Sequence, residues 1–194
     1  MTYTPKKFAL GELQGLSQKQ LDVHLALYEG YVKHVNLIHE KIQSLKNSKE
    51  DQYVINELRR RYAFEFDGMR MHEYYFEQLE GGAIVASNTE FLAALTKKYG
   101  GYDEFVAHLH ECAGTRGIGW VVVYQDPVAN LLHTVFVADH ELGQLSGLPI
   151  ILAIDLWEHA FMVDYVPAEK KNYVEAYLSN VNWNVVEERF LKAK

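Results

Sequence analysis

An acidic residue and a histidine follow the most apolar run of the chain. Asp155 ends this run, at residues 148–155, and His159 comes four residues later. An apolar run of this length predicts a buried strand. A strand end would hold the carboxylate rigidly, and the turn that leaves it can bring the imidazole to the same point, so the pair is interpreted as half of a metal site. The alternative is a buried strand whose last polar residue caps the next helix.

Two long helices are predicted earlier in the chain, and each carries a histidine on its packed face. A Ser-x-x-Gln capping box at residues 17–20 opens the first helix. The packed faces repeat at steps of three and four, through Leu21, His24, Tyr28, Tyr31, Val35, Ile38, Ile42 and Leu45 and then through Ile55, Leu58, Tyr62, Glu65, Met69, His72, Phe76 and Leu79. Because the polar link at residues 46–51 is short, we expect an antiparallel hairpin with His24 and His72 at one level. A single histidine on such a face is more often a hydrogen-bonded core residue than a ligand.

The rest of the chain predicts a second, mixed domain. We expect helices at residues 88–99 and 102–113, the first opened by a capping box at 87–90, strands at 120–124, 132–138 and 148–155, and two short helices between Pro167 and Phe190. The expected fold class is α+β: an N-terminal antiparallel long helical hairpin, then a C-terminal α/β domain with a three-stranded antiparallel sheet. The domains would span residues 1–84 and 85–194, with the metal site between them.

Composition limits the classes of function. The 194 residues are 48% hydrophobic and carry a formal net charge of -7, which argues against nucleic-acid and anionic-membrane partners. No apolar run approaches the roughly 18 residues that span a bilayer, and no signal-type segment follows the first residues, so we expect a cytoplasmic protein. Cys112 is the single cysteine and permits no intrachain disulfide. Its role stays open.

Residues 155–161, Asp-Leu-Trp-Glu-His-Ala-Phe, resemble the C-terminal signature of the iron/manganese superoxide dismutases. Three further segments are similar to that family in the same order, at residues 71–76, 117–120 and 181–183. The resemblance implies that the metal ligands are His24, His72, Asp155 and His159 and that each subunit holds one iron or manganese ion. Such a donor set suits these metals better than calcium or magnesium, although zinc would also accept it, so the native metal stays open. The implied reaction disproportionates superoxide to oxygen and hydrogen peroxide.

The same resemblance implies two catalytic residues outside the ligand set. His140 is similar to the histidine that, in some branches, bonds the solvent on the metal, whereas Gly68 stands where iron-type members often have glutamine. The alternative for His140 is a surface histidine after a strand. Tyr31 resembles the gateway tyrosine that relays protons and restricts access. It follows His24 by seven residues, one fewer than in most members.

Further residues are expected to surround the ligands. Trp157 would supply an apolar wall, and Trp120 belongs to the matching strand start at residues 117–120. Lys170 stands near the place of a family arginine that steers the anion, with a solvated surface lysine as the alternative.

The resemblance also implies a homodimer through the Glu158 and His159 region. In the family this glutamate reaches a ligand histidine of the other subunit. The histidine and tyrosine that the family pairs across the same boundary are replaced here by Leu27 or Tyr28 and by Met162. The interface is therefore expected to be rewired rather than lost. Whether dimers pair into tetramers, and whether these replacements lower activity, stays open.

Two alternatives stand beside the dismutase. A mononuclear non-haem iron oxygenase would use two histidines and one carboxylate, so one of the three histidines would have to be spare and a roomy organic pocket would be needed. A non-catalytic member of the same fold would hold metal without turnover. The aromatic residues beside His72 and His159 favour a pocket that fits only a diatomic substrate.

Overall fold

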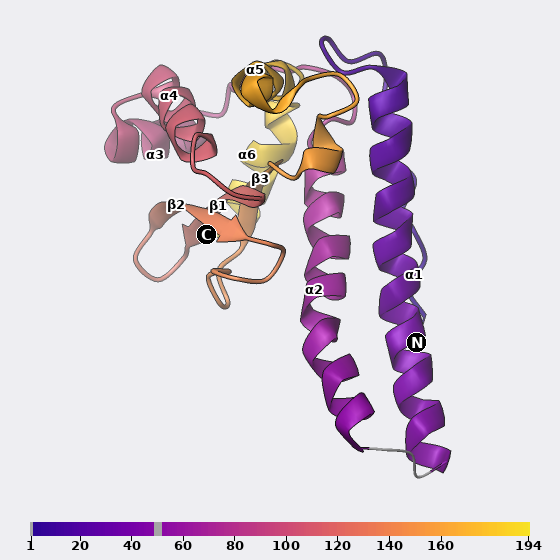
Figure 1. Cartoon of the computed structure of the whole chain (residues 1–194). Helices are drawn as coiled ribbons and strands as arrows, with labels where there is room; N and C mark the ends of the chain where they lie inside the picture. The colour runs from indigo at the N-terminus through magenta and orange to yellow at the C-terminus, as the bar shows by residue number, and fades with distance from the viewer. Residues whose placement is uncertain (1, 49–51) are drawn as a thin grey trace.

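The computed structural model describes residues 2–48 and 52–194, which form a helical hairpin and a mixed α/β part. The hairpin consists of α1 (Gln18–Ser48) and α2 (Gln52–Glu77). The mixed part contains α3 (Thr89–Tyr99), α4 (Tyr102–Ala113), β1 (Gly119–Asp126), β2 (Leu131–Ala138), β3 (Ile150–Asp155), the 3-10 turns η1 (Glu158–Ala160) and η2 (Pro167–Glu169), α5 (Lys170–Ser179) and α6 (Trp183–Lys192). In Figure 1 the sheet and the smaller helices lie on one side of α2, and α1 lies on the other. The predicted α+β fold is confirmed.

The hairpin packs along the predicted faces. Val35, Ile55, Met69 and Phe76 are all buried, whereas His34 and His39 face solvent. The lower ends of both helices extend beyond the mixed part in Figure 1. Among the described residues, no helix is long and apolar enough to cross a membrane.

The capping box that opens α1 is only half formed. Ser17 Oγ accepts a hydrogen bond from the Gln20 amide at 3.1 Å, as predicted. The Gln20 side chain does not return to the helix start. It instead donates to the His159 carbonyl at 2.6 Å and accepts from the Val163 amide at 2.9 Å. A residue predicted to cap the helix therefore ties the first turn of α1 to the segment that follows β3.

The sheet has the order β2-β1-β3, and both pairs are antiparallel. The middle strand is buried along nearly its whole length, which explains its run of apolar residues. Trp120 at its start pairs with Asp155 at the end of β3. β1 ends two residues later than predicted, at Asp126, whose Oδ1 accepts from the Val128 and Ala129 amides.

Three predicted boundaries move by a few residues. The N-cap of α3 is Asn88 and not Ser87, since Asn88 Oδ1 accepts from the amides of Glu90 and Phe91. The second helix ends at Glu77, two residues before Leu79, the last residue of its predicted packed face. The third strand begins at Ile150 because Leu148 is held in a turn by Leu145.

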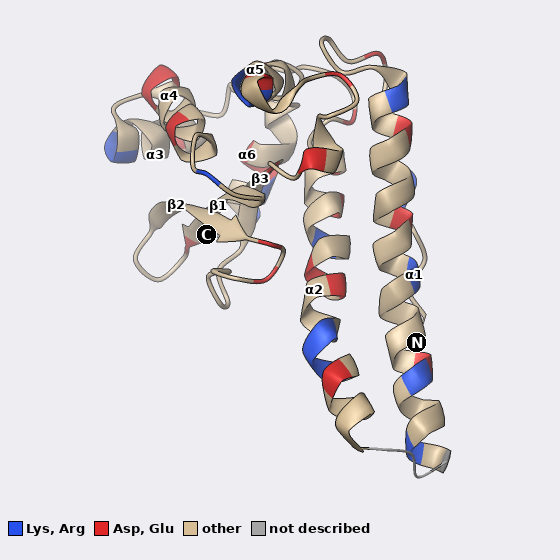
Figure 2. Ribbon diagram, viewed as in Figure 1, with Lys and Arg blue, Asp and Glu red and all other residues tan. Residues whose placement is uncertain are grey.

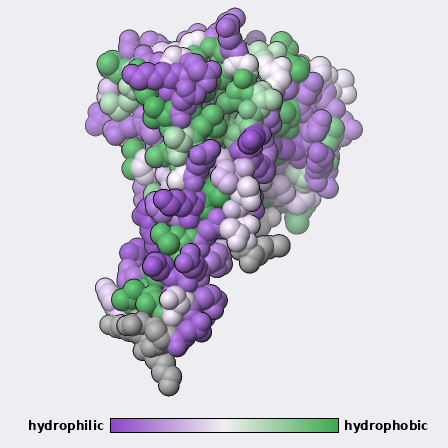
Figure 3. Space-filling view, turned by 90° about the vertical axis from the view of Figure 1, so that its right-hand side faces the viewer, coloured by the Kyte–Doolittle hydropathy of each residue, from purple (hydrophilic) through white to green (hydrophobic). Residues whose placement is uncertain are grey.

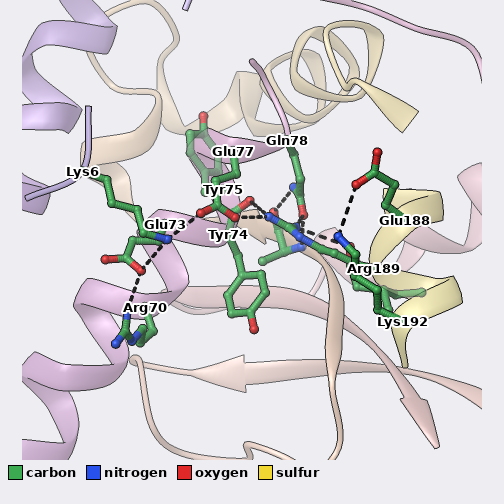
Figure 4. Close-up of polar contacts among 12 residues, drawn as sticks. Lys6, Arg70, Glu73, Tyr74, Tyr75, Glu77, Gln78, Glu188, Arg189 and Lys192 are labelled. Atoms are coloured by element: carbon green, nitrogen blue, oxygen red, sulfur yellow. Dashed lines mark hydrogen bonds and ion pairs between the residues drawn. The ribbon is translucent and has the colours of Figure 1, made fainter. Parts of the chain in front are cut away.

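A polar network fixes the C-terminal end of α2 against β3 and α6 (Figure 4). Gln78 is fully buried and bonds both backbone groups of Ala153 in β3, at 3.0 and 2.9 Å. Arg189 of α6 donates to Gln78 Oε1 and to Glu77 Oε2, both at 2.8 Å. Glu77 in turn pairs with Lys6 of the N-terminal arm at 2.6 Å. The helix that carries His72 is therefore anchored to the strand that carries Asp155.

Candidate metal centre

Four side chains from four elements meet where the hairpin joins the mixed part. His24 comes from α1, His72 from α2, Asp155 from the last position of β3 and His159 from η1. Asp155 Oδ2 lies 3.0 Å from His24 Nε2, 3.2 Å from His159 Nε2 and 3.5 Å from His72 Nε2. One donor atom from each residue lies within 4.8 Å of all the others. The hairpin places its two histidines at one level, as the sequence predicted.

The protonation states suit a cation. Burial lowers the pKa of His24 and lowers that of His72 well below its ordinary value, so both rings are neutral. Since His72 Nδ1 donates to the Gly68 carbonyl at 2.6 Å, its Nε2 lone pair faces the cluster. Burial alone would raise the pKa of Asp155, but His159 and His24 lower it overall, which keeps the carboxylate ionised. One buried negative charge beside the neutral rings of His24 and His72 fits a resident metal cation.

Backbone and side-chain bonds hold Asp155 in place. Its Oδ1 accepts from the Trp157 amide at 2.8 Å, and its carbonyl accepts from the buried Tyr173 hydroxyl at 2.8 Å. Oδ2 is left for the centre of the cluster. Tyr173 was not predicted from the sequence, because a tyrosine at helical spacing in α5 has the pattern of an ordinary core residue.

His140 and Tyr31 form a hydrogen-bonded pair beside the cluster. Trp120 Nε1 lies 3.0 Å from His140 Nδ1, and an indole N–H can only donate, so Nδ1 accepts and the proton of the neutral ring sits on Nε2. Nε2 then donates to the Tyr31 hydroxyl oxygen at 2.7 Å. Burial lowers the pKa of His140 to about 4 and raises that of Tyr31, so both are neutral. The Tyr31 hydroxyl proton remains available to another acceptor.

Aromatic rings enclose this pair. Trp157 stacks on His140, with ring centroids 4.8 Å apart, and on His159 at 5.6 Å. Phe64 packs against His140 at 4.6 Å, and the Arg61 guanidinium covers the same phenyl ring at 3.6 Å. Phe64 was not predicted as part of the site. The sequence feature that could have placed it there is its spacing, because residues 64, 68 and 72 recur every four positions on one face of α2.

Gly68 leaves room for Tyr31. A Cβ atom at this position would lie 2.7 Å from Tyr31 Cδ1 and 2.9 Å from Cε1. Its backbone carbonyl is also the acceptor for His72 Nδ1. A side chain at position 68 would therefore occupy the place that the Tyr31 ring takes beside His140.

The remaining predicted residues lie around or away from the cluster. Glu158 is exposed next to His159, and Met162 is 47% exposed. Tyr28 is buried in the hairpin, where its hydroxyl accepts from the Lys6 amide and donates to Glu73. Lys170 Nζ donates to the Thr115 carbonyl at 3.0 Å and contacts none of the four clustered residues.

Two other predicted residues also lie outside the cluster. Leu27 is half-buried on α1. Cys112 is half-buried on α4, with Sγ 3.5 Å from His108 Nε2.

The fold and the donor set define a mononuclear metal-binding protein of mixed α+β type. A family model described as iron/manganese superoxide dismutases, C-terminal domain, matches residues 87–189. The superoxide dismutase [Fe] of Aquifex aeolicus is 32% identical over 93% of this chain and 87% of its own, and the superoxide dismutase [Mn/Fe] of Aeropyrum pernix is 32% identical over 88% and 80%. The superoxide dismutase [Mn] of Mycobacterium intracellulare is 30% identical over 88% and 82%. The chain belongs to the iron/manganese superoxide dismutase family.

Proposed function

We propose that this protein is a superoxide dismutase that holds one iron or manganese ion per subunit through His24, His72, Asp155 and His159. The observation that carries the proposal is the convergence of three imidazoles and one ionised carboxylate in a buried site. A bound iron or manganese ion supplies reversible one-electron chemistry. Two superoxide anions and two protons are thereby converted to one dioxygen and one hydrogen peroxide.

Tyr31 and His140 are the proposed catalytic side chains. Trp120 fixes the tautomer of His140, and His140 donates to Tyr31, so the phenol proton points away from this bond. The reaction consumes protons in a site lined by rings. A neutral hydroxyl at its edge can hold a proton and pass it to the reduced substrate. We further propose that the charge of Lys170 helps to attract the anion.

The geometry disfavours the oxygenase alternative. That class needs one of the three histidines to stand apart from the metal. Here each histidine Nε2 lies 3.5 Å or less from the same carboxylate oxygen, Asp155 Oδ2. The rings of Phe64 and Trp157 pack around the adjoining His140–Tyr31 pair, which supports a small substrate.

A superoxide-consumption assay separates dismutation from simple metal storage. The purified protein would be stripped of metal and reloaded with iron, manganese or zinc, with metal content measured in each sample. We expect activity in the iron form, the manganese form or both, and none in the metal-free and zinc forms. Metal retention without superoxide consumption in any form would instead support the non-catalytic alternative.

We also propose that two copies of the chain pair through the Glu158 and His159 region. Exposed apolar side chains follow this region at Met162, Val163 and Val166. Figure 3 shows hydrophobic surface on the upper half of the α1 side, whereas the lower hairpin is mainly hydrophilic. His159 Nε2 faces the cluster, so its other ring nitrogen can meet a carboxylate from a second subunit.

Light scattering tests this pairing. A dimer has twice the 22.4 kDa of one chain, and a larger multiple would indicate further pairing into tetramers. Glu158→Lys should weaken association, whereas Glu175→Lys, an exposed carboxylate on α5, should not. A wild-type monomer at micromolar concentration would contradict the proposal. We also propose that the chain divides into domains at residues 1–84 and 85–194 and that the protein is located in the cytoplasm.

A further inference from the structure

The proposed substrate is an anion, whereas the chain is acidic. A formal net charge of -7 repels superoxide from the molecule as a whole, so the site needs a local positive charge to offset this repulsion. The family resemblance implies that Lys170 supplies it. Lys170 Nζ is, however, bonded to the Thr115 carbonyl, and it contacts none of the four clustered residues. A cation nearer to the cluster would act on the substrate more strongly.

Arg61 lies at the outer end of a row of side chains that leads to the cluster. It belongs to three consecutive arginines, residues 59–61, which form the blue segment on the lower half of α2 in Figure 2. The Arg61 guanidinium lies 3.6 Å from the Phe64 ring centroid, and the Phe64 and His140 rings are 4.6 Å apart. These two contacts place the guanidinium within a Debye length of the His140 ring, about 10 Å at 0.1 M salt. His140 in turn lies beside the clustered His72, with ring centroids 5.8 Å apart.

Exposure falls from the outside to the inside of this row. The Arg61 side chain is 51% exposed, Phe64 is half-buried and His140 is fully buried. Tyr31, which bonds His140, is half-buried as well. The guanidinium is therefore the part of the row that solvent reaches first.

The ion pair between Arg61 and Glu65 has its positive end outward. Arg61 Nε donates to Glu65 Oε1 at 2.8 Å, and the Glu65 side chain is only 7% exposed. The two terminal nitrogens of the guanidinium donate to no residue that the structure describes. The neighbouring Arg60 differs, because both its Nε and a terminal nitrogen bond Glu57 Oε2. An anion that approaches from solvent thus meets the Arg61 guanidinium before the Glu65 carboxylate.

The charge of Arg61 reaches the proposed catalytic pair. Burial is the main influence on both groups, raising the pKa of Tyr31 and lowering that of His140, and the charge of Arg61 lowers each pKa. Asp67 and the nearby Glu141 add negative charge to this region, and Arg61 offsets it. A cation that acts on both side chains also acts on a small anion that arrives beside them.

We propose that Arg61 attracts superoxide electrostatically to the metal site and thereby raises the rate at which the substrate arrives. The residue acts through its charge at a distance and takes no part in proton transfer. Electrostatic attraction of this kind changes association rates and depends on ionic strength. The inference rests on the proposed dismutase function.

Stopped-flow measurement of superoxide decay by the metal-loaded protein tests the proposal. Arg61→Gln should lower kcat/KM about threefold at about 0.01 M ionic strength and leave it unchanged at about 1 M, where charges are screened within about 3 Å. The value of kcat and the metal content should not change. Arg61→Lys keeps the charge and should stay within about twofold of the wild type. Arg60→Gln, a substitution of the adjacent exposed arginine, is the matched control and should have no effect.

Azide binding adds a measurement that does not require turnover. Azide is a small monovalent anion that ligates iron and manganese, and an absorbance titration gives its Kd. The Kd of Arg61→Gln should be about threefold weaker than that of the wild type at low ionic strength, and the two should agree at high ionic strength.

Two results would overturn the inference. One is an unchanged kcat/KM and azide affinity in Arg61→Gln at low ionic strength. The other is an equal loss in Arg61→Gln and Arg61→Lys at every ionic strength, which would assign Arg61 only a packing role on Phe64. A wild-type protein that consumes no superoxide would instead refute the proposed function, and the azide comparison would still decide whether Arg61 attracts anions.

Discussion

The four clustered side chains and the ring of residues around them are held in different ways. Asp155 is fixed by strand pairing with Trp120, and His24 and His72 by long helices. The surrounding residues depend more on one another. His140 follows β2 in a loop where Asp139 has a φ of 52°, and its ring is positioned by Trp120, Tyr31, Phe64 and Trp157. Substitutions among the four clustered residues, the inner set, should therefore remove the metal. Substitutions among the residues that surround them, the outer set, should change turnover while the metal stays.

The largest effect is expected in the inner set. His24→Ala removes one of four donors from a fully buried position, so metal affinity should fall by more than about 100-fold, beyond the loss typical of supporting residues, and activity with it. Metal analysis of the purified variant measures this. His34→Ala, an exposed histidine on the same helix, should keep both. Full metal occupancy in the His24 variant would remove the distinction between the two sets.

His140→Ala should lower turnover about 10- to 100-fold while metal content stays within about twofold, because it leaves Tyr31 and Trp120 without their shared partner. His140→Gln is the informative control. A glutamine can accept from Trp120 through its oxygen and donate to Tyr31 through its nitrogen, so it should retain most of the activity. Unchanged turnover in the alanine variant would exclude His140 from the mechanism.

Gly68→Ala should displace a residue of the outer set by steric clash alone. The new methyl group would lie 2.7 Å from the Tyr31 ring, which must move away from His140. We expect several-fold lower turnover and a net destabilisation of about 1 kcal/mol, since overpacking opposes the helix propensity gained. Gly30→Ala on α1 has nothing within 4 Å of the new atom and should be neutral or stabilising by up to about 1 kcal/mol. Chemical denaturation compares the two, and equal effects would contradict the packing argument.

The smallest effect is expected from substitution of Asp67, which precedes Gly68 on α2. Burial and the nearby Glu141 raise the pKa of this carboxyl to about 6. Because the pKa of Asp67 is higher in the folded protein than in the unfolded chain, its protonated form stabilises the fold. This stabilisation is complete below the unfolded pKa near 4 and is lost as the pH rises through 6. Asp67→Asn should stabilise the fold by about 1 kcal/mol at pH 7.5, after discounting for solvent, and by about half as much at pH 5. A pH-independent difference in melting temperature would argue against the shift.

The sequence predicted most of the fold because its periodicities are long and consistent. Three-four spacing on both hairpin helices located His24 and His72 at one level, and the apolar segments at residues 120–124 and 132–138 predicted the antiparallel pair. Helix and strand ends were less accurate. Asn88 and Ser87 are both good N-caps, and only the backbone conformation decides between them.

The cluster itself was predicted through residue types and resemblance, but its supports were not. Phe64 and Tyr173 follow the same periodic pattern as core residues, so spacing cannot show that one packs on His140 and the other holds the Asp155 carbonyl. The His140 tautomer depends on Trp120, twenty residues away in sequence, and no local pattern encodes it. Gln20 resembled a helix cap yet bonds a segment 139 residues later.

The span between the donor groups has a consequence for biosynthesis. His24 and Asp155 are separated by 131 positions. Synthesis runs from the N-terminus, so the emerging polypeptide offers His24 and His72 before it offers Asp155 and His159. An ion captured earlier would be held by half of its donors and could exchange with the cellular pool. The complete set of four donors therefore forms only after β3 and η1 have been made and have folded against the hairpin.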